Sequence, residues 1–167
     1  ERAERGGGVV STTVETQSEP LERDGLPAPA LAPRNLATAV QAMDLLIGPV
    51  SLSAIEIASK VRLPGRVEAR AWADRTWLLD VCHNPDGAAF LAEEVQRLYP
   101  GRRIICVLGC LADKDAAGIV DALGSVVCRW VLTSTLGARG YPATALAEDI
   151  DVGVAHVAEE LDTAVDY

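Results

Sequence analysis

The last two-thirds of the chain alternates between apolar blocks of strand length and longer blocks whose apolar residues have helical spacing. The strand-length blocks are TWLLDVC, RIICVLGC, SVVCRWVLTS and VGVAHVA. The helical blocks are PDGAAFLAEEVQRLY, ADKDAAGIVDALG, TALAEDI and EELDTAVDY. Strands that alternate with helices in this way predict an α/β fold, with a mostly parallel sheet and helices on both of its faces.

The first third of the chain has a different pattern. Residues 1–33 are rich in Gly, Ser, Thr, Glu and Pro, and within them only VVSTTVE predicts a strand, an exposed one. NLATAVQAMDLLIG places its apolar residues on one helical face, and SLSAIEIASKV predicts a second short helix. The LPG at residues 63–65 then breaks the helical pattern, so a new unit is expected to begin there.

Composition and charge restrict the possible partners. The 167 residues are 49% hydrophobic and 23% charged, as in a soluble globular domain, and the net charge is -9. Because no Lys/Arg cluster offsets this acidity, nucleic acid is not an expected partner. No apolar run approaches the roughly 18 residues that a membrane span needs, and the amino terminus has no signal-peptide core. The sequence therefore predicts a cytoplasmic protein that does not bind membranes.

The four cysteines do not have the spacing of a metal site. Cys106, Cys110 and Cys128 lie within apolar runs, where a free cysteine packs as a small hydrophobic residue. A zinc site would instead place pairs of ligands at turns. No metal ligand is predicted in this chain.

The stretch LLDVCHNPDG raises the first question about function. Asp80 and His83 follow an apolar strand directly, and Pro85 is placed to begin a helix. Ligands of parallel sheets gather at this end of the strands, where helix amino termini favour anions. Asp80 and Asn84 are also common capping residues of turns, with no further role. The residues alone therefore leave two alternatives, a capped turn or the rim of an anion or nucleotide site.

Four motifs extend the argument to most of the chain. They are LPAPALAPRNLATAVQAMDLL, LPGRVEAR, LLDVCHNPDGAAFLAEEV and LGCLADKDAAGIVDAL. In order and spacing they resemble motifs of the folylpolyglutamate and dihydrofolate synthases, which belong to the Mur ligase superfamily. The resemblance implies that residues 1–62 are a short helical tail of the central ATPase domain plus a linker. Residues 63–167 would be the Rossmann-like Mur ligase C-terminal domain, the glutamate ligase domain, expected to be truncated at its end.

The resemblance also implies an activity and a site. These ligases use ATP and Mg²⁺ to phosphorylate a carboxylate of dihydropteroate or folate, and the amino group of L-glutamate attacks the acyl phosphate. By position in the motifs, Asn35 contacts the adenine side of ATP, Arg66 and Asp80 bind the nucleotide, and His83, the catalytic candidate, lies near the terminal phosphate. The magnesium ligands belong mostly to the missing part of the ATPase domain. The chain alone is therefore expected to be inactive.

Two departures from the family pattern keep alternatives open. Val81-Cys82 replaces a Gly-Ala pair, and a valine there is expected to crowd the nucleotide or tilt the loop. No phosphate loop occurs in the sequence. The alternatives are a non-catalytic remnant or binding domain, and the third domain of a peptidoglycan Mur ligase, although HNP and LADKD favour the folate branch. Ser134 and Arg139 lie on a later rim loop, where the alternatives are contact with the substrate glutamate and a plain turn, and the plain turn is favoured.

Overall fold

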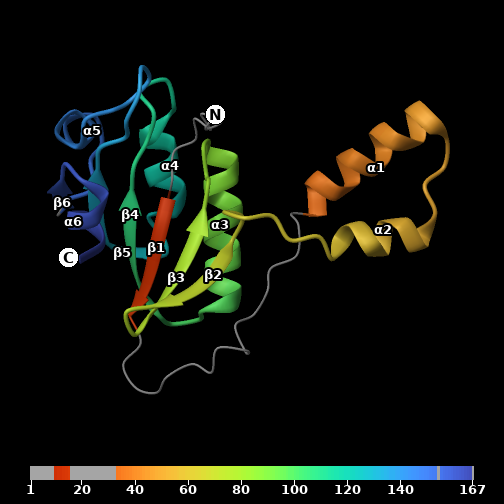
Figure 1. Cartoon of the computed structure of the whole chain (residues 1–167), viewed down its shortest axis with the longest axis horizontal. Helices are drawn as coiled ribbons and strands as arrows, with labels where there is room; N and C mark the ends of the chain where they lie inside the picture. The colour runs from red at the N-terminus through yellow and green to blue at the C-terminus, as the bar shows by residue number, and fades with distance from the viewer. Residues whose placement is uncertain (1–9, 16–32, 154, 167) are drawn as a thin grey trace.

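The computed structural model describes residues 10–15, 33–153 and 155–166, and shows a six-stranded sheet with helices packed on it (Figure 1). The strands are β1 (Val10–Glu15), β2 (Glu68–Trp72), β3 (Arg75–Asp80), β4 (Arg103–Leu108), β5 (Val127–Thr133) and β6 (Ala155–Ala158). The helices are α1 (Pro33–Ile47), α2 (Leu52–Ser59), α3 (Pro85–Leu98), α4 (Ala116–Leu123), α5 (Ala143–Asp149) and α6 (Leu161–Asp166).

The predicted α/β fold is confirmed. The strand order is β2-β3-β1-β4-β5-β6, and β4, β5 and β6 are parallel neighbours joined through α4 and α5. Strand β1 is antiparallel to both β3 and β4, so β3 runs in the same direction as β4. Strand β2 forms an antiparallel hairpin with β3, and the positive φ angles of Ala73 and Asp74 suit the tight turn between them.

Side chains alternate between the two faces of the central strands, as the pleat of a strand requires. On β4, Cys106 and Leu108 join a large apolar cluster with α3 and α4, whereas Val107 points into a smaller cluster on the opposite face. The smaller cluster includes Val131 of β5 and Ala164 of α6. Helices therefore cover both faces of the sheet, which explains why β4 is apolar along almost its whole length.

Strand β1 departs from the expectation of an exposed strand. VVSTTVE does supply a strand, but residues 10–15 pair on both sides, with Val10 opposite Asp80 of β3 and Leu108 of β4. This strand thus lies inside the sheet of the C-terminal part, although the sequence assigned it to the 1–62 segment. Local alternation predicts a strand but contains no information on its neighbours. The division between 1–62 and 63–167 itself stays a prediction.

Helices α1 and α2 form the predicted pair and stand apart from the sheet, joined to it by a short linker (Figure 1). Gly48, with φ 94°, ends α1, and the Ser51 hydroxyl caps α2 by accepting a hydrogen bond from the Ala54 N–H. No described side chain of either helix is buried. Among the described residues, no helix is long and apolar enough to cross a membrane.

Candidate functional site

All four site residues predicted from the sequence line one cavity of about 500 Å³. The cavity lies where β3 ends, α3 begins and the linker from α2 reaches the sheet. Its lining residues are Asn35, Leu63, Arg66, Val67, Asp80, His83, Asn84, Asp86, Gly87 and Phe90. Asn35 comes from α1, so the cavity has one wall on the helical pair and another on the sheet.

The first turn of α3 forms one side of the cavity. Asn84 is extended, with φ −157° and ψ 163°, and its Oδ1 accepts a 2.8 Å hydrogen bond from the Gly87 N–H. Pro85 follows in the first turn, where its missing N–H has no helical partner to lose. The capping alternative is thus correct for Asn84. It does not exclude a site, because the same turn directs a helix amino terminus toward the cavity.

Asp80 does not cap a helix, but it does cap the turn after β3, because its Oδ1 accepts from the N–H of Cys82, two residues further on. Its side chain is 6% exposed, and each carboxylate oxygen accepts a 2.8 Å hydrogen bond from a backbone N–H. Val67 donates to Oδ2 and Cys82 donates to Oδ1. Burial raises the pKa of Asp80, while the two N–H donors and the charges of Arg66 and His83 act in the opposite direction. The carboxylate therefore joins two segments of the backbone at the bottom of the cavity.

The turn that carries Arg66 has an unusual backbone. Gly65 has φ 66° and Val67 has φ 45°, although Val67 is β-branched and such residues rarely adopt positive φ. The Gly65 carbonyl accepts a 2.9 Å bond from the Val81 N–H, and the Gly65 N–H donates to Glu68 Oε2 at 2.8 Å. This hydrogen bond is the main reason that the pKa of Glu68 is lowered. The motif LPGRVE predicted a break in the helix, but not this geometry.

Val81 and Cys82 do not crowd the cavity. Neither residue is among those that line it, and Cys82 is buried in the apolar cluster, where burial raises the pKa of its thiol to about 12. A Cβ at Gly65 would lie 3.2 Å from Val81 Cγ2, so the valine packs against the glycine that begins the turn. The expected effect of Val81 on a bound nucleotide stays a prediction.

His83 and Arg66 are exposed residues that line the cavity together with the buried Asp80. His83 directly follows Cys82, and Val67 directly follows Arg66, so the two residues that donate to Asp80 are sequence neighbours of the two candidates. Asn35 is exposed on α1. The sequence did not predict the apolar residues of the cavity, Leu63, Val67 and Phe90, because isolated apolar residues beside turns give no signal of a pocket.

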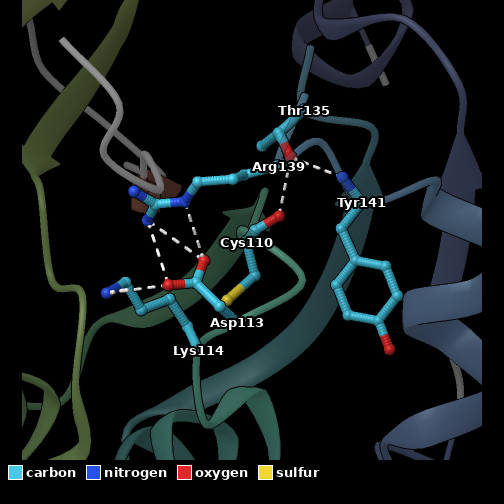
Figure 2. Close-up of polar contacts among 6 residues, drawn as sticks. All are labelled: Cys110, Asp113, Lys114, Thr135, Arg139 and Tyr141. Atoms are coloured by element: carbon cyan, nitrogen blue, oxygen red, sulfur yellow. Dashed lines mark hydrogen bonds and ion pairs between the residues drawn. The ribbon is translucent and has the colours of Figure 1, made fainter. Parts of the chain in front are cut away.

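A second polar cluster joins the loops that follow β4 and β5 (Figure 2). Arg139 donates from Nε and Nη2 to the two carboxylate oxygens of Asp113, at 3.1 Å each, and Lys114 Nζ lies 3.5 Å from Asp113 Oδ2. Thr135 Oγ1 donates to the Cys110 carbonyl at 2.7 Å and accepts from the Tyr141 N–H at 2.9 Å. These contacts fix the two loops to each other, and none of the six residues lines the cavity. The interpretation of this loop as a plain turn stays a prediction.

Within the part of the chain that the structure describes, no group of three or more His, Cys, Asp or Glu side chains could hold a metal ion. Three of the four thiols, Cys82, Cys106 and Cys110, are free and buried, and Cys128 is free and exposed. The four predicted site residues, among them the exposed Arg66, lie together in the cavity around Asp80.

Comparison with known proteins shows the family of the chain. The sequence profile of the family described as "Mur ligase, glutamate ligase domain" matches residues 65–167. A dihydrofolate synthase/folylpolyglutamate synthase of Escherichia coli (strain K12) is 37% identical over 132 residues, which are 78% of this chain and 31% of that protein. The corresponding protein of Mycobacterium tuberculosis is 38% identical over 87 residues, 52% of this chain and 18% of its own length.

Solved structures show the same relationship. A bifunctional folylpolyglutamate synthase/dihydrofolate synthase from Yersinia pestis, complexed with AMPPNP and Mn ion, superposes with a TM-score of 0.66 at 32% identity and covers 86% of this chain. E. coli FolC in complex with DHPP and ADP gives a TM-score of 0.67. The chain spans about a third of the length of these relatives, 31% of the E. coli sequence and 34% of the Y. pestis chain. With more than half of its residues matched by the family profile, the chain belongs to the Mur ligase family, in its glutamate ligase domain.

Proposed function

We propose that this chain forms the C-terminal wall of the nucleotide site in an ATP-dependent ligase that joins L-glutamate to dihydropteroate or folate. The observation that carries the proposal is the cavity in which Asn35, Arg66, Asp80 and His83 meet. Relatives that are 37% and 38% identical to parts of this chain are named dihydrofolate synthase/folylpolyglutamate synthase. Solved relatives are described with AMPPNP, ADP, Mn, L-glutamate or DHPP bound. These names favour the folate branch over a peptidoglycan ligase.

The side chains of the cavity suit a nucleotide triphosphate. The Arg66 guanidinium is a planar fork of donors that complements phosphate oxygens. His83 lies beside the amino terminus of α3, where a negatively charged phosphate is favoured. The Asn35 amide, on the other wall, can both donate to and accept from the edge of a base. In this proposal Arg66 and His83 face the phosphates and Asn35 faces the adenine.

In this proposal, the ligands of Mg²⁺ belong mostly to the missing part of the central domain. The carboxylates that line the cavity are Asp80 and Asp86, and no metal-binding group of three occurs among the described residues. ATP is therefore expected to arrive with its Mg²⁺ held by residues outside this chain. None of the described residues is assigned a role in binding the metal.

The helical pair supplies the argument for the missing ATPase domain as a partner. Helices α1 and α2 expose large apolar side chains, namely Met43, Leu45, Leu46, Ile47, Leu52 and Ile57. Exposed apolar patches of this kind mark an interface. Because the chain spans about a third of its relatives, the rest of the central domain is the proposed partner of this face. A cytosolic location, expected from the sequence, belongs to the same proposal.

The test joins this chain to the remainder of the central domain and compares Arg66→Ala with Arg62→Ala. Arg62 is an exposed arginine of the same linker that does not line the cavity, so it is a matched control. Hydrogen bonds to charged groups contribute about 1.5–3 kcal/mol, so Arg66→Ala is expected to raise the KM for ATP roughly 10- to 100-fold. Arg62→Ala should leave the KM for ATP within twofold. Equal KM values for both variants would exclude the proposed role of Arg66.

A further inference from the structure

We propose that Phe90 binds the base of the nucleotide by stacking on its face, and so fixes where the base lies in the cavity. This inference rests on the proposed function and adds one residue to its site. There, Arg66 and His83 face the phosphates and Asn35 faces an edge of the adenine, so the flat face of the base has no assigned contact. Phe90 is the single phenylalanine of the chain and lies in the second turn of α3.

The first step is the direction of the Phe90 side chain. In an α-helix a long side chain leans toward the helix amino terminus and covers the residues three and four positions before it. For Phe90 these residues are Gly87 and Asp86, and all three line the cavity. Gly87 has no side chain, so nothing fills the helix surface between Phe90 and the first residues of α3. The aromatic ring therefore borders the cavity one turn beyond the start of the helix.

The second step is the anchoring of the ring. Phe90 is partly buried and packs against the large apolar cluster, while the rest of its side chain lines the cavity. Packing on one side holds the ring in place before a ligand arrives. A ring that is already ordered loses little side-chain entropy when a base stacks on its open face.

The third step is the division of the cavity between charged and apolar side chains. Arg66, Asp80 and His83 supply charge and hydrogen-bonding groups, whereas Leu63 and Phe90 supply apolar surface. The Arg66 N–H donates to the Leu63 carbonyl at 3.2 Å, so one turn of the linker carries both a phosphate ligand and an apolar neighbour. A nucleotide has the same division, because its phosphates are charged and the faces of its base are apolar.

The fourth step is the spacing along α3. Phosphates are favoured at the amino terminus of this helix, beside Asn84. An α-helix rises about 1.5 Å per residue, so Phe90 lies about 9 Å further along the axis than Asn84. This separation leaves room for the sugar between the phosphates and a base at Phe90. Stacking tolerates any base, so Phe90 contributes affinity and position, not the choice among bases.

The experiment joins this chain to the remainder of the central domain and measures the competitive inhibition constant of ADP against ATP. Phe90→Ala is expected to raise this constant roughly fivefold or more, through the loss of one stacked base. Phe90→Trp keeps an aromatic face and should stay within about twofold of the wild type. Phe90→Leu keeps apolar volume without a ring and should give an intermediate constant.

Leu98→Ala is the matched control. Leu98 is also partly buried against the apolar cluster and lies on the same helix, but it does not line the cavity. Its substitution loosens the packing of α3 and should leave the inhibition constant of ADP unchanged. Equal effects of Phe90→Ala and Leu98→Ala would overturn the stacking role, because both would then act through the packing of the helix.

Two other outcomes would also overturn it. An unchanged constant in Phe90→Leu would mean that apolar contact without a ring is sufficient, and a loss in Phe90→Trp as large as in Phe90→Ala would mean that the aromatic face is not used. If Phe90→Ala does not fold, the leucine and tryptophan variants decide the question, because only leucine lacks a ring. If the Phe90 series has the expected order but Arg66→Ala leaves the KM for ATP unchanged, the proposed phosphate contact fails and the stacking role stands.

Discussion

Helices α1 and α3 have nearly the same length, 15 and 14 residues, and both carry apolar residues on one face, yet only α3 buries that face. Its residues Ala88, Leu91, Ala92 and Val95 pack on the sheet and on α4. Helix α1 has no buried described side chain. An amphipathic pattern therefore shows that one face of a helix requires a partner. It does not show that the partner is present in the same chain.

The largest expected effect is on stability, and it comes from substituting one leucine in each of these two helices. Leu91 in α3 is 0% exposed and Leu46 in α1 is 78% exposed. Leu91→Ala is expected to lower the free energy of unfolding by about 2–5 kcal/mol, because it leaves a cavity, whereas Leu46→Ala should change it by less than about 0.5 kcal/mol. Urea unfolding followed by the fluorescence of the buried Trp77 and Trp130 measures both. Similar losses in the two variants would show that α1 packs in this chain after all.

The second prediction concerns the contact between α3 and α4. A Cβ at Gly118 would lie 2.5 Å from Asp115 Oδ2 and 2.7 Å from Pro85 Cγ, so Gly118→Ala must displace the first residue of α3. Overpacking of this kind costs about 1–3 kcal/mol, and the better helix propensity of alanine offsets at most about 1 kcal/mol.

Gly124→Ala is the control for Gly118→Ala. Its Cβ would meet no atom closer than 3.4 Å, and Gly124 already has a right-handed backbone, with φ −56°. The free energy of unfolding should therefore stay within about 0.5 kcal/mol of the wild type. If both glycine substitutions are neutral, the close approach of α3 and α4 is not needed for stability.

A smaller effect is expected for the loops after β4 and β5. The ion pair of Arg139 and Asp113 is bidentate, but both side chains are more than half exposed. A double-mutant cycle of Arg139→Ala and Asp113→Ala should therefore give a coupling energy of about 0.2–1 kcal/mol, decreasing with added salt. A coupling energy as large as the loss of stability in Leu91→Ala would mean that exposed ion pairs stabilise this part of the chain as strongly as the buried face of α3 does.

The smallest effect concerns Tyr141, whose hydroxyl donates to Asp149 at the exposed end of α5. This hydrogen bond raises the pKa of Tyr141 to about 12 from a usual value of 10.0. Because the folded pKa is the higher one, the contact stabilises the fold below pH 10.0 and is lost as the pH rises through 12. An NMR titration of the Tyr141 ring should show a lower pKa in Asp149→Asn; an unchanged titration would show that the contact does not form in solution.

The sequence predicted more of the site than its local signals justified. Alternating apolar blocks were sufficient for the α/β fold, and the four motifs identified Asn35, Arg66, Asp80 and His83, which do line one cavity. The place of β1 and the partners of Asp80 were not predictable. Strand pairing depends on residues distant in sequence, and the bond from Val67 to Asp80 spans 13 residues. The positive φ of Val67 contradicts the preference of valine, so it is visible only in three dimensions.

The hydrogen-bonded turn at residues 65–67 also determines where the linker between α2 and the sheet can bend. Gly65 and Val67 are hydrogen-bonded to Val81 and Asp80, so this turn is fixed to the end of β3. A rotation of α1 and α2 must therefore pivot in the short segment between Lys60, where α2 ends, and Gly65. Arg66 and His83 would keep their separation during such a swing, while Asn35 would travel with the helices. The distance from Asn35 to Arg66 is thus one that such a rotation would change, and with it the width of the cavity.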